Sequence, residues 1–428
     1  MKSRHTEICI IAAHTFVERG YDATSVNDIA AAIGITKAGL YHYISSKESL
    51  LFDIVTLGFD ALDEKVVALT RDIKDPEERL RAIVLRHAAL AIRVDGVITR
   101  LSEEEVHALP PAPRRKINQR RRRYFDYVRD TLIELQKDGR LHDIDVTVAA
   151  FSILGIIMTL PQWYRPDGRL TDEEVAAEVL RFVAAGLLRP RPHRKRSASI
   201  ARRVPLVMPE QRRLARRAFP QLNPRRFEIC MTSARRFVER GFEATSVNDI
   251  ASALGVTKAG LYHYISSKEA LFFEILSLGM DWLDEDVIKP VRRIEDPEAR
   301  LRETIKRHAL LTACNEPWIT ELLGEMQALR RPDRETILVR KRTYVGMVRH
   351  MFNQLAAAGR LRDLDHTVAV YSALGMIVWI PRWLNPKGRL SRDQVAADVA
   401  TFALNALLKP DAKTRGTAMV AADFSAVL

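Results

Sequence analysis

A short cluster of polar side chains near residue 40 has the chemistry of a surface that binds nucleic acid. The cluster comprises Thr36, Lys37, Tyr41 and His42. Hydroxyl, ammonium, phenol and imidazole groups hydrogen-bond to base edges and to phosphate oxygens, so one short segment supplies both kinds of contact. The same residue types return later in the chain at the same spacing, as Thr257, Lys258, Tyr262 and His263.

Signals for short helices surround this cluster. Ser25 and Asp28 have the spacing of a capping box, which predicts a helix that begins after Ser25. Gly34 allows a tight turn, and Thr36 is a good N-cap for a second helix that ends near Tyr43. Two short helices joined by a glycine turn are typical of a helix-turn-helix, whose second helix enters the major groove. An ordinary helical hairpin with surface lysine and tyrosine is the alternative.

Two further helices should hold this pair in place. Apolar spacing predicts a helix over residues 6–19 that ends at Gly20, and Ser45 with Glu48 predicts the cap of a long fourth helix. The second copy repeats these capping and turn signals at Ser246, Asp249, Gly255, Thr257, Ser266 and Glu269. Glycine and proline lie between apolar periodic segments and no stretch shows sustained alternation, so we expect an all-α fold.

The whole chain of 428 residues is organised as two copies of one unit. Residues 19–54 align with residues 240–275, with 28 of 36 positions identical, and the similarity continues more weakly for about another 130 residues. Each unit should contain a helix-turn-helix head and a helical regulatory body. The expected segments are head 1 (1–60), body 1 (61–190), a basic linker (191–224), head 2 (225–281), body 2 (282–410) and a disordered tail (411–428).

Charge and composition narrow the functional class. The formal net charge is +13, and residues 189–226 hold thirteen Lys and Arg but one acid, so this segment carries nearly all of the excess. Such a block either contacts a polyanion such as DNA or is a solvated, self-repelling linker. Three cysteines without paired spacing exclude a disulfide framework or a thiolate zinc site. The longest uncharged runs are short and end at prolines, and no signal peptide opens the chain, so we expect a cytoplasmic protein without a membrane span.

The heads resemble a known family. The strings over residues 24–30, 34–44 and 46–48, which recur over residues 245–269, are similar to the DNA-binding head of the TetR/AcrR regulators. The resemblance implies an all-α regulator that binds double-stranded DNA through its head and a small molecule through its body, with no cofactor. It places DNA contacts on Ser25, Thr36, Lys37, Ala38, Gly39, Tyr41, His42 and Lys47, and in the second copy on Ser246, Thr257, Lys258, Ala259, Gly260, Tyr262, His263 and Lys268.

The tandem arrangement departs from that family, whose members are ordinarily single units that pair as homodimers. We therefore expect an intramolecular pseudo-dimer that reads a near-palindrome, with half-sites about one helical turn, roughly 34 Å, apart or somewhat more. A homodimer of tandem chains is the alternative.

The bodies resemble the acyl-CoA-responsive subgroup of these regulators. The similarity lies in residues 108–110, an arginine-rich helix before Tyr124, residues 139–141 and residues 163–170. An acyl chain needs an apolar tunnel between helices, and CoA phosphates need arginine nearby. Candidate ligand residues are His87, Arg120, Tyr124, Trp163, His308, Tyr344 and Trp379. Structural roles in the core or on a solvated face are the alternative for each of them.

We expect a repressor that is released from DNA by a small apolar effector, and the sequence also bears on other functional classes. No nucleophile elbow, metal-ligand spacing or glycine-rich phosphate loop occurs in the sequence, so we expect no enzyme. An architectural DNA binder without a ligand, or an activator, would share the same heads.

Overall fold

The computed structural model describes residues 4–93, 98, 101, 105–189, 223–314, 322–385 and 387–409. These residues form helices and connecting turns, and two isolated bridges, Leu141 to Leu188 and Leu361 to Leu408, are the extended pairings among them. The all-α prediction is confirmed. The expected linker and tail lie outside the described residues, except that Asn223 caps the first helix of the second unit and Pro224 begins it.

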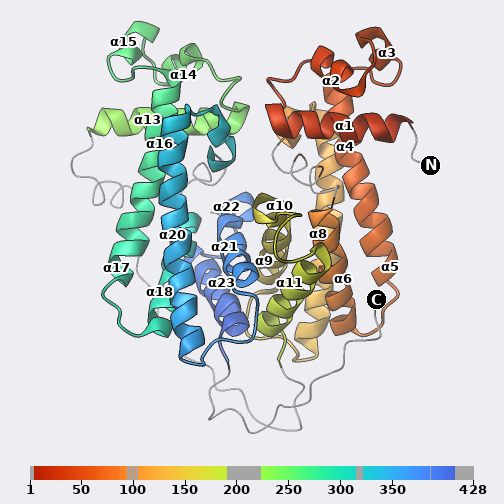
Figure 1. The fold of residues 1–428 in the computed structure, drawn as a ribbon, viewed down its shortest axis with the longest axis vertical. Helices are drawn as coiled ribbons and strands as arrows, with labels where there is room; N and C mark the ends of the chain where they lie inside the picture. Colours follow the sequence, from red (N-terminus) through yellow and green to blue (C-terminus); the bar gives the residue numbers. More distant parts are fainter. Residues whose placement is uncertain are drawn as a thin grey trace.

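The two units contain the same helices in the same order (Figure 1). Unit 1 contains α1 (Arg4–Arg19), α2 (Val26–Ile33), α3 (Lys37–Tyr41), α4 (Lys47–Leu62), η1 (Asp63–Val67), α5 (Ala68–Thr70), α6 (Pro76–Ile92), η2 (Val106–Ala108), α8 (Pro111–Lys137), α9 (Val146–Met158), α10 (Leu160–Trp163) and α11 (Asp172–Leu187). Unit 2 contains α13 (Pro224–Arg240), α14 (Val247–Ala253), α15 (Lys258–Tyr262), α16 (Lys268–Trp282), η3 (Leu283–Ile288), α17 (Lys289–Val291), α18 (Pro297–Cys314), η4 (Leu323–Ala328), α20 (Arg331–Ala357), α21 (His366–Val378), α22 (Ile380–Trp383) and α23 (Arg392–Leu407).

Side-chain caps fix the short helices of the head. The capping box of Ser25 and Asp28 is present, with the backbone N–H of Ser25 2.9 Å from the Asp28 carboxylate. Gly34 ends α2 at φ 79°, a left-handed conformation that suits glycine. The fourth helix begins at Lys47, but its predicted cap is wrong by one residue, because Ser46, not Ser45, has the extended backbone of an N-cap and pairs with Ser49. The second unit shows the same shift, since Ser267 rather than Ser266 caps α16.

Each head shares its core with part of its own body. The core of head 1 holds α1, α2 and α4 residues together with Ile117 of α8 and four residues that precede α8, which are Ile98, Leu101, Val106 and Leu109. The fourth helix also continues beyond the head, since α4 runs into the π-helical turn η1 without a break. Head and body are therefore joined by a continuous helix and by a common apolar core.

The two bodies pack on each other through four helices, α9 and α11 of unit 1 against α21 and α23 of unit 2 (Figure 1). One buried cluster extends through all four helices. The segment 146–163 could cross a membrane by length and mean hydropathy (1.6), but more than half of it (56%) is buried inside the protein. In this structure α9 is a core helix, because its apolar surface is covered by protein.

Candidate nucleic-acid interface and regulatory bodies

The expected reading residues lie on one exposed surface of each head. Thr36, Lys37, Ala38, Tyr41 and His42 are all exposed. Tyr41 is 47% exposed, a large value for an aromatic residue. Their counterparts Thr257, Lys258, Ala259, Tyr262 and His263 have the same exposure classes. Ser25 and Ser246 are also exposed, at the start of the preceding helix.

The helix that carries these residues is short and tightly capped. The hydroxyl of Thr36 accepts from the backbone N–H of Gly39 at 3.0 Å, and Thr257 accepts from Gly260 at the same distance. A Cβ at Gly39 would lie 3.2 Å from the Thr36 hydroxyl, so a larger residue would press on the cap. Glycine thus keeps the backbone of α3 accessible and its first turn intact.

Lys47 has internal partners. Its ammonium donates to the carbonyl oxygens of Tyr21 at 2.9 Å and Thr24 at 3.2 Å, and it lies 4.2 Å from the centroid of the Tyr21 ring. Lys268 repeats this arrangement with the carbonyl of Phe242 at 2.8 Å and the Phe242 ring at 4.2 Å. The lysine therefore ties the first turn of the fourth helix to the loop between the first two helices.

Both heads lie at the same end of the molecule. In Figure 1 the pair α2 and α3 and the pair α14 and α15 stand at the top, above the shared bundle of the bodies. Each head is joined to its own body by a continuous helical segment, because α4 runs into η1 and α16 runs into η3. One chain thus presents two copies of the same polar surface from a single scaffold.

A histidine–tyrosine pair lies inside each body, in which His87 and both tyrosines are buried and His308 is half-buried. The Tyr124 hydroxyl is 2.9 Å from Nδ1 of His87, and the Tyr344 hydroxyl is 2.8 Å from Nδ1 of His308. Burial lowers the pKa of His87 to about 3 and that of His308 to about 4, and it raises the pKa of both tyrosines. All four groups are therefore neutral at pH 7 and connect the two long helices of each body, α6 with α8 and α18 with α20.

The remaining candidate ligand residues have protein partners. Arg120 pairs with Asp60 at 2.7 Å and Asp63 at 2.5 Å, which links α8 to the helix that leaves the head. Trp163 stacks on Tyr371 of the other unit with the ring centroids 4.9 Å apart. Trp379 is 6% exposed and packs against Gly155. The structure thus brings His87 and Tyr124 together, and likewise His308 and Tyr344, while Trp163 and Trp379 lie between the bodies.

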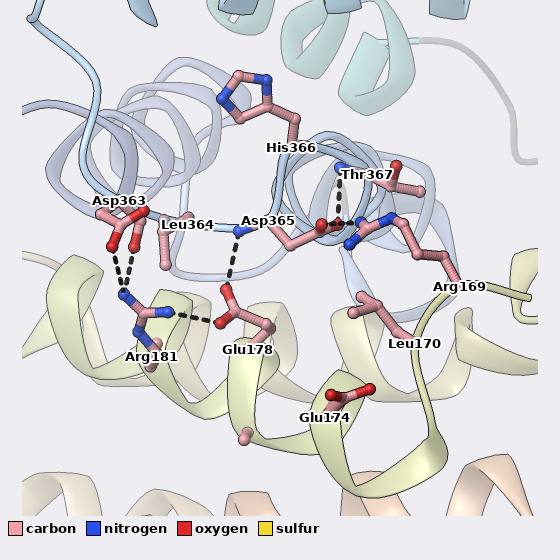
Figure 2. Close-up of a pocket in the computed structure, with 11 residues that line it drawn as sticks. Arg169, Leu170, Glu174, Glu178, Arg181, Asp363, Leu364, Asp365, His366 and Thr367 are labelled. Carbon is pink, nitrogen blue, oxygen red and sulfur yellow. Dashed lines mark hydrogen bonds and ion pairs between the residues drawn. The ribbon is translucent and has the colours of Figure 1, made fainter.

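Residues that sequence reasoning missed connect the two bodies at the edge of the bundle. Arg169 pairs with Asp365, and the backbone N–H of Asp365 donates to Glu178 at 2.9 Å (Figure 2). Arg181 donates to the carbonyl oxygen of Asp363. These side chains line an open cavity of about 630 Å³, whose charged groups pair with one another across the two units. The signal in the sequence was the repeat itself, because Arg169 and Arg389 occupy equivalent positions.

Two family models each match the chain twice, once in each unit. The model described as "Bacterial regulatory proteins, tetR family" matches residues 11–54 and 230–275, and "Tetracyclin repressor-like, C-terminal domain" matches residues 74–187 and 295–407. The HTH-type transcriptional repressor KstR2 of Rhodococcus jostii is 34% identical over 196 residues, which are 44% of this chain and 92% of that protein. KstR2 of Mycobacterium tuberculosis is 29% identical and covers 44% of this chain and 94% of its own length.

Two solved structures are also similar to one unit. AibR, in complex with isovaleryl coenzyme A and operator DNA, is 38% identical, covers 42% of this chain and 96% of its own, and has a TM-score of 0.40. The ketosteroid transcriptional regulator KstR2 of Mycobacterium tuberculosis is 28% identical, covers 44% and 97%, and has a TM-score of 0.42. The family models alone match more than half of this chain, once in each unit. The chain belongs to the TetR family of regulatory proteins and carries both of the family's domains twice.

Proposed function

We propose that this chain is a ligand-responsive repressor that reads a near-palindromic operator as a single-chain pseudo-dimer. One observation carries the proposal: two heads with the same reading residues, equally exposed, project from the same end of one shared helical bundle. In a two-fold arrangement each head meets one half-site, with the half-sites about one helical turn, roughly 34 Å, apart or somewhat more. The bundle then holds the two heads of one chain in place, as a dimer interface holds the heads of two chains.

The reading residues divide into two roles. Thr36 and His42 have hydrogen-bonding groups of a size that reaches base edges, whereas Lys37 and Tyr41 suit phosphate oxygens. Ala38 and Gly39 leave room for the DNA backbone to approach α3 closely. The equivalent residues of α15 take the same roles at the second half-site. Because Lys47 and Lys268 have internal partners, their contribution to DNA binding is to hold the loop after α1 or α13 in place.

Repression, rather than activation, is supported by the relatives. KstR2 is a repressor and matches with 34% identity over nearly its whole length, whereas the activator FasR of Mycolicibacterium smegmatis is 26% identical over 83% of its own length. As in other bacterial regulators of this family, the site of action is DNA in the cytoplasm, and no enzymatic step is part of the proposal.

The effector is a small apolar molecule, and an acyl-CoA is the first class to examine. The support is the resemblance of the body segments at residues 108–110, 139–141 and 163–170 to acyl-CoA-responsive regulators. Arg120 is an unsuitable phosphate ligand in this conformation, because Asp60 and Asp63 already neutralise it. We assign the buried pair of His87 and Tyr124, with its counterpart in unit 2, as the polar groups that a bound effector would approach.

Selection of bound DNA from a random pool tests the proposal. The full chain should enrich a near-palindrome, because the two α3-type helices are identical in sequence from residue 36 to 44 and from 257 to 265. The double variant Y41A/Y262A provides the control, since it should enrich no sequence while keeping its helical circular dichroism. Enrichment of a single, unpaired half-site would contradict the pseudo-dimer, and enrichment of nothing by the wild-type chain would contradict DNA reading altogether.

A further inference from the structure

The surface through which the two bodies pair is nearly two-fold symmetric in its polar and aromatic contacts. From Tyr124 and Tyr344 onward, equivalent residues of the two bodies differ by 220 in number. The ring stack of Phe151 on Trp383, at 4.7 Å, is repeated with exchanged roles by Trp163 on Tyr371, at 4.9 Å. Arg389 pairs with Asp145 at 2.7 Å, just as Arg169 pairs with Asp365. These contacts would form equally well between two copies of either unit.

Other positions in the same interface differ between the units. Gly186 of α11 lies against Phe402 of α23, and a Cβ at Gly186 would be 2.3 Å and 2.5 Å from two ring carbons and 2.8 Å from the backbone oxygen of Phe402. Real Cβ atoms do not approach other atoms so closely. The residue equivalent to Gly186 is Ala406, and the residue equivalent to Phe402 is Phe182. A pair of two second units would therefore place alanine, not glycine, against Phe402 on both sides.

At the crossing of α9 and α21, the difference between the units disfavours a pair of first units instead. Trp379 covers Gly155, where a Cβ would lie 2.6 Å from the Cβ of Trp379 and 2.9 Å from the backbone oxygen of Gly375. The equivalent residue of unit 1 is Thr159, which is buried and directs its hydroxyl at the carbonyl of Gly155 in its own helix, 2.8 Å away. A pair of two first units would therefore place Thr159 on both sides and would lack the packing of the indole against Gly155.

We propose that the pairing face of each body is complementary to the other unit and disfavours a second copy of itself. Two second units would clash at Phe402, and two first units would lose the packing of Trp379. The inference rests on the single-chain pairing of the proposed function and adds selectivity to it. Its consequence is that every assembled particle contains one body of each kind, so the two regulatory bodies of a particle are never identical.

Variants of the full chain can imitate each disfavoured pair. G186A gives both sides the alanine of a pair of second units, and A406G is its matched control at the equivalent position. Helix propensity alone would make G186A stabilising and A406G destabilising. Steric contact with Phe402 reverses the first sign, so we expect G186A to lower the thermal unfolding midpoint by about 3 °C or more and to lie below A406G.

A swap variant and a tryptophan variant complete the test. G186A/A406G moves the glycine to the other side and should regain at least half of the loss, because the rest of the interface is nearly symmetric. W379T imitates a pair of first units and should also lower the midpoint by about 3 °C or more, whereas W379F, which keeps an aromatic ring, should lower it less.

The inference is overturned if G186A is as stable as the wild-type chain, or if the swap variant is no better than G186A. Loss of operator selection by the wild-type chain would instead remove the proposed function, so the two failures can be told apart. Native mass measurement of each variant shows whether the particle still holds one chain.

Discussion

Replacing Lys47 and Lys268 by methionine separates a structural role from a phosphate contact. Each ammonium makes a hydrogen bond shorter than 3 Å to a carbonyl of the loop after the first helix and lies 4.2 Å from an aromatic ring. A hydrogen bond to a charged group contributes about 1.5–3 kcal/mol, and an exposed cation–π contact about 0.5–1 kcal/mol. Because both lysines are only half-buried, we take about 2 kcal/mol per head. K47M/K268M should therefore unfold several degrees below the wild-type chain.

The DNA arm of this experiment uses the dependence of affinity on salt. Each phosphate contact adds about 0.9 to the slope of log affinity against log salt. If Lys47 is internal, the slope of the folded variant stays at the wild-type value and the affinity falls at all salt concentrations alike. K37M/K258M is the control, because Lys37 and Lys258 are exposed and should lower the slope without a change in unfolding midpoint. An unchanged midpoint together with a lower slope in K47M/K268M would refute this account of the lysine.

Three further outcomes follow from the same structure. Y41A/Y262A should lose operator binding in a mobility-shift assay with unchanged circular dichroism, and binding within threefold of wild type would contradict the assigned surface. His87 and His308 are neutral in the fold, with pKa lowered to about 3 and about 4. Their contribution to the free energy of unfolding is therefore fully present above about pH 6.5 and is lost progressively as the pH falls toward these values. In urea titrations at several pH values, H87F/H308F should flatten that decline, and H14Q, at an exposed position, should not. An effector at 100 times its Kd should add about 2.7 kcal/mol of stability; thermal shifts of zero across a panel of acyl-CoAs would exclude that class.

The helices and their ends were predictable where the signal is local. Ser25, Asp28, Gly34 and Thr36 act within one turn of the backbone they cap, and the structure forms the capping box and the turn they predict. The cap of the fourth helix differs by one residue from the prediction because Ser45 and Ser46 are adjacent and both have suitable side chains. Only the backbone angles decide between them, and these depend on how α3 ends.

Contacts between distant segments could not be predicted from local sequence patterns. Ile98, Leu101 and Ile117 belong to the body by position but complete the core of head 1, because their side chains share one buried cluster with residues of α1 and α4. Arg120 was expected near a ligand phosphate, and its ion pairs with Asp60 and Asp63 depend on a packing of α8 on α4 that no local pattern encodes. The exchanged stacks of Phe151 and Trp163 could have been found by pairing equivalent aromatic positions of the two repeats.

The number of chains bound to each operator duplex tests most directly whether one chain acts as a pseudo-dimer. A native mass measurement of the chain with the selected duplex should give one chain per duplex with both half-sites protected from cleavage. Two chains on one near-palindrome, or one chain protecting a single half-site, would contradict a pseudo-dimer built within one chain.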